Sequence, residues 1–148
     1  MFLTAMTEPE CEALLTSGSF AHLACIDGDR PYVVPIHYVF QTGGFYSFSM
    51  PGKKIDSLRK NPHACVQLET IGTDGGWQSV VLDGLYQELP DTPEWHDEHM
   101  NAWSLLQKRT NWWEPGAYTV DAGAPDTPVL PVFYSLRINS LSGRKATH

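Results

Sequence analysis

Residues 30–49 decide the fold of this chain, and they read RPYVVPIHYVFQTGGFYSFS. Two runs rich in β-branched and aromatic residues flank a polar, glycine-containing turn, which is the pattern of two antiparallel strands joined by a hairpin. We expect strands over Pro31–Phe40 and from the turn to Ser49. Residues 31–52 include no Lys, Arg, Asp or Glu. Bulky apolar or aromatic residues at successive positions predict that both faces of this hairpin are covered.

The rest of the chain repeats the strand signal at short intervals. Further strands are expected at Ser19–Ile26, His63–Thr70, Trp77–Glu88 and Val129–Ile138. Helices are expected at about residues 7–17, from Lys53 to Asn61-Pro62 and over Glu94–Thr110, followed at about residues 142–148 by a loose tail. Six short strands joined mainly by hairpin turns predict a mainly β fold with peripheral helices. We therefore expect residues 1–148 to form a single domain around a six-stranded antiparallel barrel, closed or nearly closed.

Two short motifs refine this outline. Thr7 and Glu10 are spaced as a capping box, and Pro9 is tolerated in a first turn, so the first helix is expected to begin here. Gly84 interrupts the strand at Trp77–Glu88. A glycine inside a strand indicates a bulge or a close approach of another backbone.

Composition narrows the classes of function. The net charge of −7 argues against nucleic acid or an anionic membrane as a partner, because both need a large basic face. No apolar run approaches the roughly 18 residues that a membrane-spanning helix requires. Three cysteines without a CxxC pair or a signal peptide predict reduced thiols and a cytoplasmic protein. His96 and His99 have a spacing that metal ligands use, but no third ligand accompanies them, so no metal site is expected.

Pro35 is the first residue that indicates a binding site. Because proline lacks an N–H group, a strand that contains it is expected to be an edge or bulged strand at that point. Some backbone groups near Pro35 would then be free to bind a flat heteroaromatic ring with donors and acceptors along its edge. A half-buried strand that ends at a proline bulge explains the same pattern without a ligand.

A second signal follows the hairpin, where four of the ten Lys and Arg residues fall between positions 53 and 60. Lys53 and Lys54 begin the second expected helix, and lysines there oppose the helix dipole unless an anion is bound. Free N–H groups and two ammonium groups would suit a phosphate, and Ser79 could add a hydroxyl donor to the same group. A solvent-exposed surface helix is the alternative interpretation.

The order and spacing of these segments resemble the pyridoxamine 5′-phosphate oxidase-like, FMN-binding split-barrel proteins. The chain looks closest to their branch of small flavoproteins that includes nitroimidazole-resistance-type reductases. The similarity covers roughly residues 5–142 and rests on the segments Arg30–Ile36, Phe45–Phe48, Gly52–Pro62, Ser79–Gly84 and Trp112–Gly116. The resemblance implies a six-stranded Greek-key split barrel that forms a homodimer, with FMN in each of two clefts at the interface.

The resemblance also implies roles for particular residues. The isoalloxazine ring would lie along Val33, Val34, Pro35, Ile36 and His37, and the ribityl chain beside Ser47 and Phe48. The phosphate would be held by Lys53, Lys54 and Ser79. The last cofactor-binding candidate is Trp113, in the tryptophan-rich region Trp95–Trp113 that is expected to form the dimer contact.

The activity that the resemblance implies is that of an FMN-dependent oxidoreductase acting on a small molecule. His37 is a candidate proton relay, and a hydrogen-bonded structural histidine is the other interpretation. Pyridoxamine phosphate oxidation is not expected, because Arg137-Ile138-Asn139-Ser140 lacks the basic and histidine motif of the vitamin B6 oxidases. Relatives on the same fold degrade haem or use deazaflavins. A flavin or haem carrier or sensor, or a deazaflavin-dependent reductase, is therefore the alternative.

Overall fold

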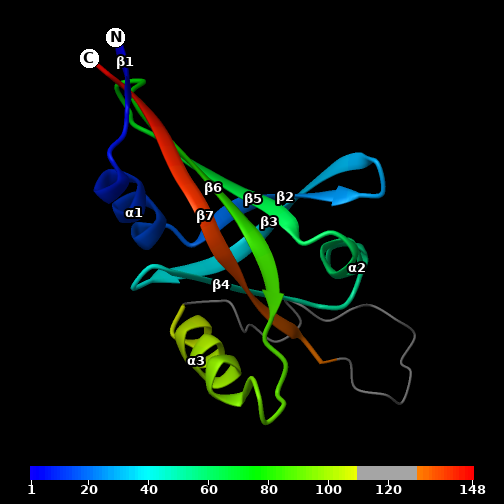
Figure 1. The fold of residues 1–148 in the computed structure, drawn as a ribbon. Coiled ribbons are helices and arrows are strands. Elements are labelled where there is room, and N and C mark those ends of the chain that lie inside the picture. The colour runs from blue at the N-terminus through cyan, green and yellow to red at the C-terminus, as the bar shows by residue number, and fades with distance from the viewer. Residues whose placement is uncertain (110–129) are drawn as a thin grey trace.

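The computed structural model describes residues 1–109 and 130–148, which are built around one antiparallel sheet (Figure 1). The strands of this sheet are β1 (Phe2–Ala5), β2 (Phe20–Asp27), β3 (Arg30–Gln41), β4 (Gly44–Ser49), β5 (His63–Ile71), β6 (Trp77–Glu88) and β7 (Val132–Thr147). Their order is β1-β7-β4-β3-β2-β5-β6, and β6 pairs again with β7. The strands β2 to β7 therefore close into a ring, which confirms the expected six-stranded antiparallel barrel.

The strand β1 lies outside this ring and was not expected from the sequence. It pairs with the last residues of β7, where Phe2 lies opposite Thr147 and Ala5 lies opposite Arg144. All of its side chains are exposed. β1 therefore extends the sheet at one end of the barrel, where Figure 1 shows both termini close together.

The expected loose tail at about residues 142–148 is wrong, because β7 continues to Thr147. This end of β7 is paired on both sides, with β1 on one edge and with β6 on the other, where Val80 lies opposite Gly143. Ala146 is buried as well. The polar sequence SGRKATH gives little strand signal, but backbone pairing with two distant strands does not depend on apolar side chains.

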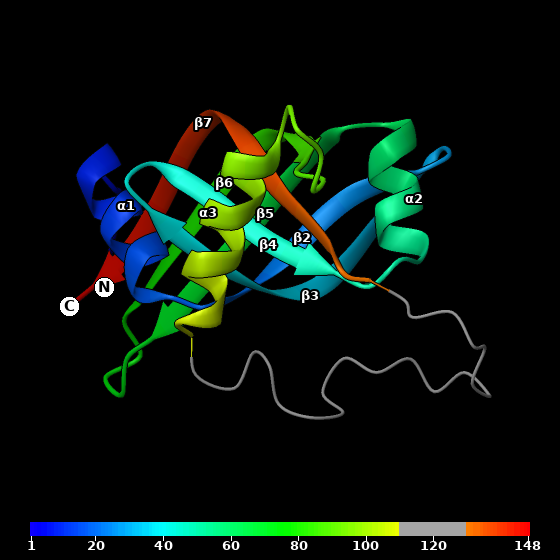
Figure 2. The same cartoon turned by 90° about the horizontal axis from the view of Figure 1, so that it is seen from below.

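The helices of the described chain pack around the barrel, and they are α1 (Glu8–Ser17), α2 (Lys53–Lys60) and α3 (His96–Gln107). Thr7 caps α1, and the predicted capping box with Glu10 is present. Figure 2 shows α3 crossing the sheet beside β4, whereas α2 lies near the β2–β3 hairpin. None of the helices in the described chain has the length and apolar content needed to cross a membrane.

Apolar side chains form two packed clusters on opposite sides of β4. The larger cluster fills the barrel and includes Leu23, Phe45 and Leu82. The smaller cluster includes Phe48 on β4 and Leu106 on α3. Both faces of β4 are thus covered, as its sequence predicts.

Gly84 marks an irregularity of β6, as predicted. The register between β6 and β7 shifts between Asp83 and Gly84. A Cβ atom at Gly84 would lie 2.7 Å from the carbonyl oxygen of Arg137, so the two backbones come too close for a side chain. The residue left without a partner at this irregularity is Asn139 of β7, between Ser140 opposite Asp83 and Ile138 opposite Gly84.

Candidate functional site

The strand β3 has an open edge over its first half, and this edge is the centre of the candidate site. β3 pairs with β2 from Arg30 to His37, but it pairs with β4 only from Tyr38 to Gln41. Within the described chain, no strand pairs with the other edge of residues 30–37. The barrel is therefore split between β3 and β4, and the predicted edge strand at Pro35 is confirmed.

The backbone of this edge explains why proline is tolerated. Tyr38 donates its N–H to the carbonyl of Ser19 on the β2 side, whereas the carbonyl of His37 accepts from the Ser47 hydroxyl on the β4 side. Because backbone groups of successive residues point to opposite edges, those of Val33 and Pro35 also point to the open edge. The N–H group that proline lacks would point to the open edge at Pro35, where β4 does not pair with β3. Its absence therefore costs the sheet no hydrogen bond.

Side chains of the same stretch alternate between solvent and the barrel. Val33, Pro35 and His37 are exposed, and Val33 reaches 63%. Ile36 is buried in the barrel core, and Val34 packs against that core. One face of this half of β3 is therefore open, which corrects the expectation that both faces of the hairpin are covered.

His37 lies on the exposed face beside β2. Its ring contacts Phe20 edge-to-face, with 5.3 Å between the ring centroids. Its carbonyl oxygen is 2.6 Å from the Ser47 hydroxyl that donates to it. His37 is therefore next to the open edge, where its imidazole can hold or move a proton, and its catalytic role remains a prediction.

Lys54 is a half-buried cation at the start of α2. Its Nζ donates to the Ser49 hydroxyl at 3.2 Å, and it has no ion pair within the described residues. Burial lowers the pKa of Lys54 from its ordinary value, because the protein removes water from the ammonium group. The N-cap residue Gly52 has no side chain to accept from the first N–H groups of α2. Carboxylates near this helix start are Asp56 in the first turn of α2 and Asp27 beside Lys53, but within residues 1–109 and 130–148 neither forms an ion pair with Lys54.

Lys53 has a different environment from its neighbour. Its Nζ forms an ion pair with Asp27 at 3.2 Å and lies 4.6 Å from the centroid of the Tyr32 ring. These contacts place the start of α2 against the end of the β2–β3 hairpin. The sequence does not indicate the contact residues Asp27, Tyr32 and Ser49, because their spacing does not place them beside the lysines.

Both of the proposed ribityl contacts, Ser47 and Phe48, are buried. Ser47 is fully buried inside the barrel, and its hydroxyl is occupied by the His37 carbonyl. Phe48 points to the other side of β4 and packs in the cluster under α3. A ligand beside this part of β4 would therefore meet mainly backbone atoms. Trp113 lies outside the described residues.

Ser79 is not close to the two lysines in one chain. Its hydroxyl accepts from the Gln67 side chain at 3.0 Å, and Gln67 lies opposite His22 on β2. Along β2, His22 is five residues from Asp27, the partner of Lys53, which corresponds to about 16 Å. Ser79 and Lys53 of the same chain therefore cannot hold one phosphate.

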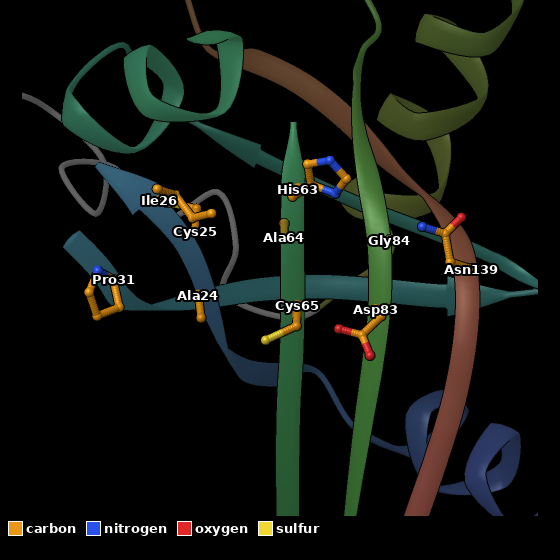
Figure 3. Close-up of a pocket in the computed structure, with 10 residues that line it drawn as sticks. All are labelled: Ala24, Cys25, Ile26, Pro31, His63, Ala64, Cys65, Asp83, Gly84 and Asn139. Carbon is orange, nitrogen blue, oxygen red and sulfur yellow. The ribbon is translucent and has the colours of Figure 1, made fainter. Parts of the chain in front are cut away.

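A shallow cavity of about 300 Å³ lies on the exposed face of the sheet formed by β3, β2, β5 and β6, which we call the outer face (Figure 3). Its lining includes Ile26, Pro31, His63, Cys65 and Asp83. Burial, and to a lesser degree the carboxylate of Asp83, raise the pKa of the Cys65 thiol. The thiol therefore stays protonated at neutral pH and is a poor nucleophile.

The histidines of α3 have protein partners. His96 Nδ1 lies 2.7 Å from the Asp91 carboxylate, and this contact raises the pKa of His96. His99 Nδ1 lies 2.8 Å from the carbonyl oxygen of Leu89. Across residues 1–109 and 130–148, no three His, Cys, Asp or Glu side chains gather in a way that could hold a metal ion.

Comparisons with known proteins agree with this architecture. The family model described as pyridoxamine 5′-phosphate oxidase matches residues 7–145. An uncharacterized protein of Rhizobium meliloti (strain 1021) is 40% identical over 146 residues, which cover 99% of this chain and 97% of that protein. The structure of a FAD-binding protein from Mesorhizobium loti is 41% identical, with a TM-score of 0.80, and the match covers 99% of this chain and 100% of that chain. A candidate 5-nitroimidazole antibiotic resistance protein from Bacteroides thetaiotaomicron has the same fold at 16% identity and a TM-score of 0.70, over 98% of this chain and 89% of that chain. The chain therefore belongs to the pyridoxamine 5′-phosphate oxidase family.

Proposed function

We propose that this protein binds a flavin nucleotide, FMN, between the open edge of β3 and the start of α2, and that it acts as an FMN-dependent oxidoreductase on a small molecule. The observation that carries the proposal is Lys54, a half-buried ammonium group without a carboxylate partner in the described chain. Such a cation at an uncapped helix start favours a phosphate. A FAD-binding relative at 41% identity supports a flavin.

The open edge has the groups that a flavin ring needs. The N–H of Val33 and the carbonyl oxygens of Val33 and Pro35 point away from β2, so they can bind the donors and acceptors along the ring edge. The exposed side chains of Val33 and Pro35 offer an apolar surface to the ring face. FMN supplies the hydride or electron transfer when it is bound, and the chain orients it. His37 would hold a proton near the ring.

We further propose that the protein is a homodimer whose two copies meet through the outer face. Phe20, Ile26 and Val33 are large apolar side chains exposed on this face. A cluster of this kind on a soluble protein marks a contact with another molecule. Ser79 also lies on the outer face, so a second copy that meets this face could bring its own Ser79 hydroxyl toward the phosphate at Lys54.

The first test is the spectrum and the mass of the flavin that co-purifies with the protein. FMN or FAD supports flavin binding, and the mass distinguishes them, whereas a protein that stays colourless after incubation with FMN contradicts the proposal. Reduction of the bound flavin by NADH or NADPH, followed by oxidation by a nitroaromatic compound, would support an oxidoreductase. A flavin that neither reductant reduces would favour a carrier.

The second test removes the charge of Lys54. Lys54→Gln should weaken FMN binding by about ten- to a hundredfold, because a hydrogen bond to a charged group is lost. Riboflavin, which lacks the phosphate, should bind the variant and the wild type equally. Lys60→Gln at the exposed end of α2 is the matched control and should leave both affinities unchanged. Equal FMN affinities of the Lys54→Gln variant and the wild type would place the phosphate elsewhere.

A further inference from the structure

The strand β7 places an arginine beside Ser79, the phosphate candidate that does not reach the lysines of its own chain. Arg144 lies directly opposite Ser79 across the β6–β7 pair, so the two side chains leave the same face of the sheet, with their Cβ atoms about 5 Å apart. A Cβ atom at the preceding Gly143 would point the other way, toward Cys11 and Met6 in the core. Arg144 is exposed, and it continues the outer face onto β7.

Both side chains can donate to an anion. The Ser79 hydroxyl accepts from the Gln67 amide, which leaves its own hydrogen to donate. The Arg144 guanidinium forms no ion pair within the described chain, although the exposed carboxylate of Glu69 lies opposite Ser79 on β5. A guanidinium beside a hydroxyl matches the oxygens of a phosphate, which arginine binds through two parallel hydrogen bonds.

The candidate phosphate site at the start of α2 has no net positive charge from its nearest side chains. Lys53 and Lys54 begin the helix, but Asp56 lies in the same first turn and Asp27 is paired with Lys53. These four charges sum to zero, whereas a phosphate monoester carries about −1.5 to −2 at pH 7. The helix dipole contributes only about half of one positive charge. A further cation would therefore strengthen phosphate binding.

Arg144 of the same chain does not reach this site. It lies one strand beyond Ser79, which is already too far from Lys53 to share a phosphate with it. Figures 1 and 2 show the end of β7 and the helix α2 on opposite sides of the molecule. A second copy on the outer face can bring the arginine there, and a two-fold axis would give each site the Arg144 of the other copy.

We propose that Arg144, together with its own Ser79, binds the phosphate of the flavin that is held at Lys54 of the other copy. This role of Arg144 rests on the proposed flavin site and the proposed dimer. It adds a residue from the polar end of β7 to the site. An arginine that only keeps the surface hydrated would leave flavin binding unchanged, whereas a phosphate contact changes the affinity for FMN and not for riboflavin.

The first experiment is a fluorescence titration of the apoprotein and its variants with FMN and riboflavin. Arg144→Gln should weaken FMN binding by about tenfold, because a charged donor to the phosphate is lost, and it should leave riboflavin binding unchanged. Arg137→Gln is the matched control. Arg137 is an exposed arginine of the same strand, but it lines a cavity beside α3 with Trp95 and Glu98, so both affinities should stay at the wild-type values.

The second experiment uses a mixed dimer to show which copy supplies the arginine. Lys54→Gln and Arg144→Gln chains with different affinity tags are co-expressed, and the dimers that carry both tags are purified. If Arg144 acts across the interface, one site has both substitutions and the other has neither, so half of the sites should bind FMN as tightly as the wild type. If Arg144 acts within its own chain, every site has one substitution and no site recovers.

An FMN-selective loss in Arg144→Gln, together with recovery of half of the sites in the mixed dimer, supports the proposal. Wild-type FMN affinity in Arg144→Gln, an equal loss for riboflavin, or a mixed dimer without recovered sites overturns the role of Arg144 and leaves the flavin site at Lys54 standing. A wild type that binds FMN as a monomer has the same consequence. A wild type that binds neither FMN nor riboflavin overturns the flavin site as well.

Discussion

Tyr38 shows how one hydroxyl group joins the barrel strand β3 to the helix α1. It is buried, and it donates to the carbonyl oxygen of Leu15 at the end of α1 at a distance of 2.7 Å. Burial raises the pKa of Tyr38 to about 12, so the hydroxyl remains a donor throughout the neutral range. Tyr38→Phe keeps the ring that stacks on Phe45 but leaves the Leu15 carbonyl without this donor. We expect it to lower the free energy of unfolding by about 1–2 kcal/mol, measured by urea denaturation.

The control for this substitution is Tyr46→Phe on the neighbouring strand. The Tyr46 hydroxyl has no hydrogen-bond partner among the residues that the structure describes, and its side chain is half-buried. Its removal should change the free energy of unfolding by less than about 0.5 kcal/mol. Equal effects of the two substitutions would mean that the Tyr38 hydrogen bond does not stabilise the contact between α1 and β3.

At the same scale, the two adjacent lysines mark the limit of what the sequence predicts about the site. Their position at the start of a helix was predictable, because Gly52 and the apolar positions of Ile55 and Leu58 define α2. The sequence did not predict that the two lysines have different environments. Successive residues of a helix point about 100° apart. Lys53 therefore forms its ion pair with Asp27 at the β2–β3 hairpin, whereas Lys54 donates a hydrogen bond to Ser49. Only the tertiary placement of α2 distinguishes them.

At the scale of elements, Gly143 of β7 lies close to both β6 and α1. A Cβ atom there would lie 2.8 Å from Cys11 Sγ, 2.9 Å from Met6 Sδ and 3.0 Å from the carbonyl oxygen of Ser79. Gly143→Ala should therefore force these elements apart and lower the free energy of unfolding by about 1–3 kcal/mol. Thermal or urea denaturation measures this change.

Ser142→Ala provides the comparison on the same strand. Ser142 is exposed, so its substitution should stay within about 0.5 kcal/mol of the wild type. If Gly143→Ala were equally neutral, the last residues of β7 would not be packed as the structure shows. The pair of variants thus distinguishes a strand from a loose tail at residues 142–148.

The strand β7 also shows why some elements were predictable and others were not. Its first part, VFYSLRI, has the apolar and aromatic residues of a strand, and the hairpins at residues 27–30 and 41–44 have local turn signals. The second part of β7, like β1, has no such signal. Both form because two distant segments meet, so their strand structure depends on the closure of the whole barrel.

At the scale of the whole molecule, the split between β3 and β4 and the outer face belong to one arrangement. β3 contributes its open edge to the candidate flavin site and its exposed side chains to the outer face. The register pairs Phe20 with His37 and Ala24 with Val33 on β3, and Ala24 also with Cys65 on β5, so these side chains form one continuous surface. A second copy on this surface would lie next to the flavin, which connects dimerisation to cofactor binding.

The dimer proposal predicts that a charge on the outer face separates the copies. The wild type should sediment at twice the 16.5 kDa of one chain, and Phe20→Lys should sediment as a monomer, because Phe20 is a large apolar side chain that is 49% exposed on the proposed contact face. Met100→Lys on α3 is the matched control, since Met100 is similarly exposed at 42% but lies outside the outer face, and it should remain a dimer. The Phe20→Lys monomer should also bind FMN more weakly than the wild type if the second copy completes the site. A monomeric wild type, or a Phe20→Lys variant that sediments as a dimer, would exclude the outer face as the interface.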